Sequence, residues 1–80
     1  MQSLAKLNWQ CRRGMQELDR LLLHYLNTNY LLADRDEQQL FEYLLTLEDN
    51  DLIHFLLGNQ LPKEPQLAEL IKTIRTATTV

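Results

Sequence analysis

The 80-residue sequence contains two glycines, two prolines and one cysteine, and its single valine is the last residue. So few glycines exclude a glycine-rich phosphate-binding loop, and with it the common nucleotide-binding motifs. One cysteine excludes an intramolecular disulfide, which favours a reducing compartment and a cytoplasmic protein. Leucine supplies 19 positions. A chain rich in leucine and poor in valine, glycine and proline favours helices over a β-sheet.

Long apolar runs and a positive charge are also missing. No run approaches the roughly 18 residues that a membrane span requires, and the first residues lack the apolar core of a signal peptide. The formal net charge is −3, which argues against binding nucleic acid through its phosphates. Residues 1–33 carry a net charge of +2 and residues 34–64 a net charge of −6. We therefore expect one soluble helical domain over residues 1–80, with no membrane insertion and no nucleic-acid partner.

Apolar residues at helical spacing predict an all-α bundle of about five short helices. The expected helices cover residues 4–13, 15–27, 35–47, 51–57 and 65–75. Residues 76–80 are expected to be frayed. Ser3 is the expected N-cap of the first helix, and Gly14 is expected to form the turn that separates it from the second. The expected core residues are Leu18, Leu21, Leu22, Tyr25, Leu26, Leu40, Phe41, Leu44, Leu47, Leu67, Leu70, Ile71 and Ile74.

The caps of the middle helices carry further expectations. Asp34 and Glu37 have the spacing of a capping box, in which each side chain binds the other residue's backbone N–H. Either Asp49 or Asn50 is expected to cap the fourth helix, and Gly58 is expected to end it. That helix is apolar on two faces, so it is either buried on both sides or exposes one side to a partner.

The candidates for chemistry are few and scattered. Cys11 is a possible nucleophile only if the fold brings a histidine beside it, and lone helical cysteines are usually packing residues. His24 and His54 lie thirty residues apart, without a second ligand at three or four residues. We therefore expect no catalytic residue, no metal site and no cofactor site. A helix-turn-helix is a weaker alternative, because Glu17 occupies the first turn where bases would be read.

A compact charged segment surrounds Gly14. It contains Trp9, Arg12, Arg13, Gly14, Glu17 and Asp19. One interpretation is a well-capped turn. In it the helix dipole stabilises the negative charge of Glu17 in the first turn, and Trp9 is a core residue. The other is a surface for a partner, because glycine lets another backbone approach closely and tryptophan and arginine are enriched at interfaces. Asp19 is awkward because it lies inside the apolar arc of its helix, but near a helix N-terminus a carboxylate can be tolerated by bonding free backbone N–H groups.

Residues 8–19 resemble the signature of the FAD assembly factor family, SdhE or YgfY, which assembles succinate dehydrogenase. The core of that signature is Arg-Gly-x-x-Glu, matched by Arg13, Gly14 and Glu17. An acidic turn, an Asp-Leu pair and an aromatic-Leu pair follow within residues 48–56, as in the family, and the resemblance covers nearly the whole chain. The sequence departs from the family pattern at Asn50, Phe55 and Leu61, where relatives often carry proline, tryptophan and glycine.

The resemblance implies an assembly chaperone and not an enzyme. Family members are small helical monomers that bind the flavoprotein subunit of succinate dehydrogenase or fumarate reductase. They promote covalent attachment of FAD to a histidine of that subunit, so FAD is handled by the partner and not bound stably here. The implied partner-binding residues are Trp9, Arg12, Arg13, Gly14, Glu17, Asp19 and Asp51. The alternative is a protein-binding regulator or antitoxin-like adaptor with no role in flavinylation.

Overall fold

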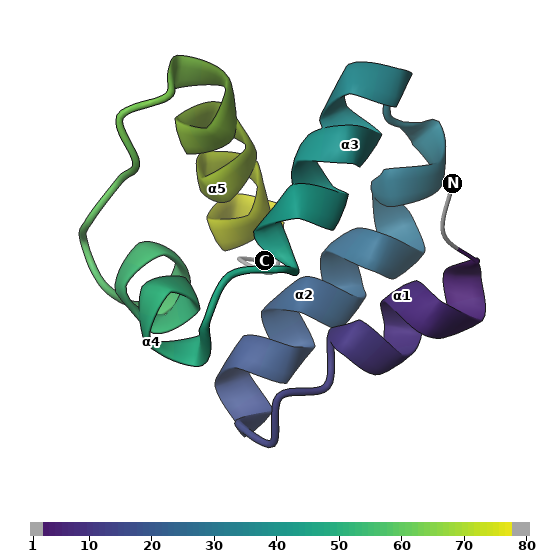
Figure 1. Ribbon diagram of the computed structural model, residues 1–80, viewed down its shortest axis with the longest axis horizontal. Helices are drawn as coiled ribbons and strands as arrows, with labels where there is room; N and C mark the ends of the chain where they lie inside the picture. The colour runs from purple at the N-terminus through teal and green to yellow at the C-terminus, as the bar shows by residue number, and fades with distance from the viewer. Residues whose placement is uncertain (1–2, 78–80) are drawn as a thin grey trace.

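The computed structural model describes residues 3–77 (Figure 1). Its elements are α1 (Leu4–Gln10), α2 (Gln16–Thr28), the 3₁₀ turn η1 (Tyr30–Leu32), α3 (Arg35–Leu44), α4 (Asp49–Leu52), the π-helical turn η2 (Ile53–Leu57) and α5 (Pro65–Ala77). No strand occurs in residues 3–77, which confirms the all-α prediction. Helix α5 extends two residues past the expected bound at residue 75, through Thr76 and Ala77, and residues 78–80 of the expected frayed tail lie outside the described residues.

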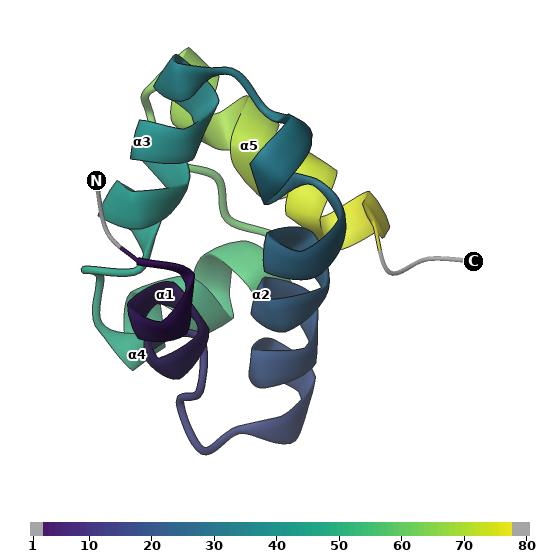
Figure 2. The ribbon, with the colours of Figure 1, turned by 90° about the vertical axis from the view of Figure 1, so that its right-hand side faces the viewer.

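The helices form two groups. Helices α3 and α5 occupy one half of the molecule, and α1, α4 and the first turns of α2 occupy the other (Figures 1 and 2). Helix α2 runs between the two groups and packs against α1, η2 and α5. In both views the connection between α1 and α2 projects at the lower end of the molecule, away from α3 and α5.

The core is built from one face of each long helix. Its buried side chains are Leu7, Cys11, Leu18, Leu22, Tyr25, Leu26, Tyr30, Phe41, Leu44, Leu45, Leu52, Leu56, Leu67, Leu70, Ile71 and Ile74. The apolar faces predicted for α2 and α5 are confirmed, with Leu21 half-buried at the edge. Tyr30 was not expected, because it lies in a predicted connector. Its ring stands 5.6 Å from that of Phe41, which in turn lies 4.7 Å from the ring of Tyr25.

Two helices end earlier than their apolar spacing predicts. Helix α1 ends at Gln10 and not near Arg13. The Cys11 N–H is shared between the Leu7 and Asn8 carbonyls, and the Arg12 N–H bonds the Trp9 carbonyl, three residues back, at 3.1 Å. Helix α3 ends at Leu44 and not at Leu47, and the Leu47 N–H bonds the Leu44 carbonyl at 3.1 Å. This tighter turn buries Leu45 and leaves Leu47 half-buried.

The predicted N-caps are confirmed at two helices. The Ser3 hydroxyl accepts from the Lys6 N–H at 3.2 Å, and the Asp34 carboxylate accepts from the Glu37 N–H at 2.8 Å. The capping box at Asp34 is only half formed among the described residues. The Glu37 carboxylate turns instead to α2, where it accepts a hydrogen bond from the Tyr25 hydroxyl.

The fourth helix differs from its prediction at its start. It begins at Asp49, with Glu48 as an N-cap that makes no side-chain bond, so neither Asp49 nor Asn50 is the cap. The predicted stop at Gly58 is confirmed. A Cβ there would meet the His54 carbonyl oxygen at 2.7 Å, so the wide π-helical turn leaves no room for a side chain. Both apolar faces pack against the core except at Leu57, whose side chain is 41% exposed.

Candidate partner-binding site

The turn between α1 and α2 depends on Gly14. Its φ of +82° lies in the left-handed region, which residues with a Cβ rarely adopt. No heavy atom of the described chain lies within 4 Å of the position that a Cβ would occupy, apart from the neighbouring residues. Glycine is therefore required here by backbone conformation and not by crowding. The space beside it is open to another molecule.

Asp19 holds this turn from the first turns of α2. Its Oδ1 accepts a hydrogen bond from the Arg13 backbone N–H at 2.7 Å, and its Oδ2 accepts from the Gly14 N–H at 3.3 Å. These two N–H groups precede the helix and have no helical partner, so the carboxylate satisfies them. The awkward place of Asp19 in the apolar arc follows from this task. It faces the turn and not the core.

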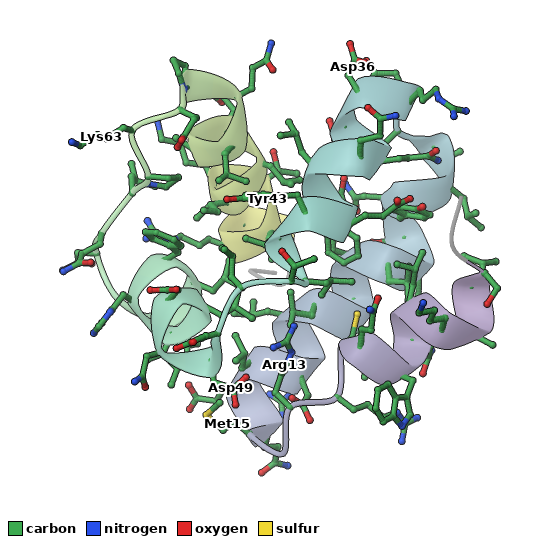
Figure 3. All side chains as sticks on the ribbon, in the orientation of Figure 1. Arg13, Met15, Asp36, Tyr43, Asp49 and Lys63 are labelled. Atoms are coloured by element: carbon green, nitrogen blue, oxygen red, sulfur yellow. The ribbon has the colours of Figure 1, made fainter. Side chains whose placement is uncertain are left out.

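Arg13 points inward from the same turn. Its Nε donates to the Gln10 carbonyl at 2.9 Å, and its Nη2 donates to the Leu45 carbonyl. Its Nη1 donates to the Leu47 carbonyl and to Asp49 Oδ1, both at 3.1 Å. Figure 3 shows the side chains of Arg13 and Asp49 directed toward each other. The Arg13 side chain is only 16% exposed, so its donors serve the fold.

The neighbouring side chains point outward. Arg12 and Glu17 are exposed, and neither makes a side-chain hydrogen bond or ion pair within residues 3–77. Trp9 is 75% exposed on α1, which excludes it as a core anchor. Asp51 is exposed on α4, two residues beyond the Asp49 carboxylate that binds Arg13. Of the seven predicted residues, Arg12, Arg13, Gly14, Glu17 and Asp19 belong to the turn and the first turns of α2. Trp9 lies on α1, which leads into the turn, and Asp51 lies on the helix that Arg13 ties to it.

A shallow hollow lies beside Glu17. It is lined by Glu17, Arg20, Leu21 and Leu57, and so it joins the first turns of α2 to η2. Leu57 is the side chain of the fourth helical segment that the core leaves exposed. The hollow offers an apolar floor beside a free carboxylate.

The cysteine and the two histidines considered as catalytic or metal-binding residues do not form a site. Burial raises the pKa of the Cys11 thiol to about 12, so the thiolate needed for nucleophilic attack does not form at neutral pH. His54 is exposed and His24 half-buried. Within the described chain, no three histidine, cysteine or carboxylate side chains are grouped to hold a metal ion. None of the helices over residues 3–77 is long and apolar enough to cross a membrane.

Sequence reasoning missed the part that Asp49 takes in the site. Asp49 and Arg13 lie 36 residues apart, and no periodicity links two positions so distant. Tyr25 was expected in the core, but its bond to Glu37 was not. Burial, together with the bond to the Glu37 carboxylate, raises the pKa of the Tyr25 hydroxyl strongly. The hydroxyl is therefore kept protonated as a donor.

Comparison with known proteins gives one consistent result. The family model Sdh5, described as the flavinator of succinate dehydrogenase, matches residues 5–78. The FAD assembly factor SdhE of Methylococcus capsulatus is 47% identical to this chain over 94% of it and 90% of its own length. Proteins of the same name from Yersinia pseudotuberculosis and Photorhabdus laumondii are 33% and 35% identical, and they cover 90% and 89% of this chain and 82% and 81% of their own lengths. No solved structure matches it.

Proposed function

This chain belongs to the Sdh5 family, the flavinators of succinate dehydrogenase, and we propose that it docks on the flavoprotein subunit through the outer side of its Gly14 turn. One observation supports this site above all. Arg13 and Asp19 brace the turn from within, while Arg12, Glu17 and Trp9 extend from it with no partner inside residues 3–77. A rigid turn that presents free polar groups and an exposed tryptophan has the composition of an interface centre.

Each outward group has a chemical task in this proposal. The bare backbone at Gly14 lets a strand or loop of the flavoprotein come close enough for backbone contact. Glu17 and Arg12 supply charge-assisted hydrogen bonds, which are stronger in a partly dry interface than in water. Trp9 covers apolar surface with a rigid ring. Asp51 extends the contact onto α4.

The chain acts by positioning and supplies no reacting group of its own. In this proposal FAD stays with the flavoprotein, whose histidine forms the bond. The Cys11 thiol of this chain is buried with a raised pKa, which makes it a poor nucleophile. The factor favours the flavoprotein conformation in which flavin and histidine are aligned, because it binds that conformation more tightly than others. We propose that it works as a monomer in the cytoplasm. The fumarate reductase flavoprotein presents a second partner of the same kind.

Co-expression with a succinate dehydrogenase flavoprotein tests the proposal. Covalent FAD is read by in-gel flavin fluorescence, with Glu17→Gln compared with wild type and with Glu69→Gln on α5, which is also exposed. We expect Glu17→Gln to lower the fluorescence severalfold and Glu69→Gln to leave it unchanged. Normal flavinylation with a folded Glu17→Gln variant would contradict the site. Binding of the flavoprotein with no gain in fluorescence over cells lacking the factor would favour the adaptor alternative.

A further inference from the structure

We propose that Arg13 is a positioning residue, which joins the Gly14 turn to the connection between α3 and α4 so that both form one docking surface. This inference rests on the proposed function. It gives adjacent arginines opposite tasks: Arg12 contacts the flavoprotein, and Arg13 holds the surface in shape without contacting it.

The bonds of Arg13 carry the inference. The guanidinium donates hydrogen bonds to the carbonyls of Gln10, Leu45 and Leu47 and to the carboxylate of Asp49. Three of these four acceptors lie 32 to 36 residues further along the chain. A planar guanidinium can reach several acceptors at once in a fixed geometry. With 16% of its side chain exposed, Arg13 has little surface left for a partner.

The connection after α3 needs this support. Helix α4 has only four residues, and its N-cap makes no side-chain bond. The carbonyls of Leu45 and Leu47 follow the last turn of α3, where a helix leaves acceptors without helical partners. Arg13 supplies donors to both carbonyls and an ion pair to the first residue of α4. Its loss would remove the side-chain bonds that tie the start of α4 to the Gly14 turn.

The two segments also meet at the surface. Arg13, Glu48, Asp49 and Asn50 line one shallow hollow beside the turn. The docking surface therefore continues from the Gly14 turn onto the start of α4. Apart from the Arg13–Asp49 pair, the exposed charged side chains of this surface are Glu17, Glu48 and Asp51 against Arg12 and Arg20, so it carries an acidic excess. We expect the complementary surface of the flavoprotein to carry a basic excess.

Matched variants at the two arginines test the inference. Affinity for the flavin-free flavoprotein subunit is measured by calorimetry at several salt concentrations, at a temperature where circular dichroism shows each variant folded. We expect both Arg13→Lys and Arg13→Gln to weaken binding about tenfold, because lysine keeps the charge but cannot span the four acceptors. We expect Arg12→Lys to keep most of the affinity, because an exposed contact depends mainly on charge.

Salt dependence separates contact from positioning. Arg12→Gln and Arg13→Gln remove the same charge at adjacent positions, so their long-range effects match. We expect the salt dependence of binding to change more for Arg12→Gln than for Arg13→Gln, because only Arg12→Gln removes a direct charged contact with the flavoprotein. Loss of stability alone would lower the melting temperature and leave the affinity of the folded variant intact.

Three results would overturn the inference. The first is wild-type affinity in folded Arg13→Lys, and the second is an equal change in salt dependence for both glutamine variants. If the Arg13 variants do not fold, Asp49→Asn takes their place, because its side chain is 48% exposed and it removes the ion pair to α4. We expect about threefold weaker binding from it, and unchanged affinity would be the third. Failure of the wild-type chain to bind the flavoprotein would instead contradict the proposed function.

Discussion

The carboxylate of Asp19 accepts a hydrogen bond at 2.7 Å from the backbone N–H of Arg13, six residues earlier in the chain. The same carboxylate reaches the Gly14 N–H, so one side chain closes the turn on which the docking surface stands. Arg13 is thereby held at both ends, its backbone by Asp19 and its guanidinium by Asp49. These few hydrogen bonds therefore determine both the stability of the turn and the shape of the docking surface.

Removing the Asp19 carboxylate should loosen the turn. We expect Asp19→Ala to lower the free energy of unfolding by about 1–3 kcal/mol, because two backbone donors lose their charged acceptor. Asp19→Asn keeps one carbonyl acceptor and should cost less. Urea unfolding followed by circular dichroism measures both. The control is Asp36→Ala on α3, an exposed first-turn acid, which should cost less than about 1 kcal/mol. Equal losses at the two positions would contradict the role of Asp19.

The two glycines should respond to alanine for different reasons. We expect Gly14→Ala to cost about 1–2 kcal/mol, since its φ of +82° strains a residue with a Cβ. Gly14→Asn should cost less than Gly14→Ala, because asparagine tolerates the left-handed region. Gly58→Ala should cost up to about 3 kcal/mol, because its Cβ meets a backbone oxygen that cannot turn away. Gly58→Asn should be no better than Gly58→Ala in thermal unfolding, and a rescue there would contradict the steric explanation.

The buried thiol of Cys11 should make the fold sensitive to alkali. Burial raises its pKa from 9.0 to about 12, so above pH 9 the unfolded chain loses this proton while the folded chain keeps it. The free energy of unfolding should therefore fall as pH rises above about 9, by up to about 1.4 kcal/mol per pH unit from this group. Urea midpoints between pH 8 and pH 10 measure the slope. Cys11→Ala should be less stable at pH 8 yet show a shallower slope, and an unchanged slope would refute the assignment.

The exposed indole of Trp9 should matter for docking and little for folding. We expect Trp9→Ala to change the melting temperature by only a few degrees, because the side chain is 75% exposed. Its affinity for the flavoprotein should fall by about 2 kcal/mol or more, as for a tryptophan at an interface centre. Calorimetry measures the second quantity. Leu61→Ala is the control: this exposed residue lies in the loop before α5, across the molecule from α1 in Figure 1. Equal affinities for the two variants would remove Trp9 from the interface.

The sequence predicted the fold wherever an apolar stripe decides it. Helices α2 and α5 carry such stripes, and their buried faces match the prediction because leucines at three- and four-residue spacing leave one way to pack. The core residues that the sequence did not predict lie where the backbone departs from the 3.6-residue period of the α-helix. Tyr30 sits in a 3₁₀ turn and Leu45 at a tightened helix end, and neither position extends an α-helical stripe. The start of α4 was missed because Glu48 makes no side-chain cap bond that its type could signal.

The turn at Gly14 could be predicted from the sequence, but the different roles of its two arginines could not. The turn at Gly14 follows from the glycine itself, and the exposed Trp9 is compatible with the predicted surface. Nothing local distinguishes Arg12 from Arg13, which are identical neighbours with opposite orientations. That difference depends on carbonyls and a carboxylate more than thirty residues away, and only the folded chain brings these groups together.

The last described helix sets the order in which this chain can fold during synthesis. Helix α5 supplies Leu67, Leu70, Ile71 and Ile74 to the core. Its Arg75 donates to the carbonyls of Phe55 and Gln60, which ties down the loop before it. A ribosome releases these residues after α1 to α4, so the earlier helices emerge before the element that covers them. The bonds around Gly14, in contrast, are complete once Asp49 has emerged. All partners of the bonds around Gly14 therefore emerge from the ribosome before the helix that completes the interior.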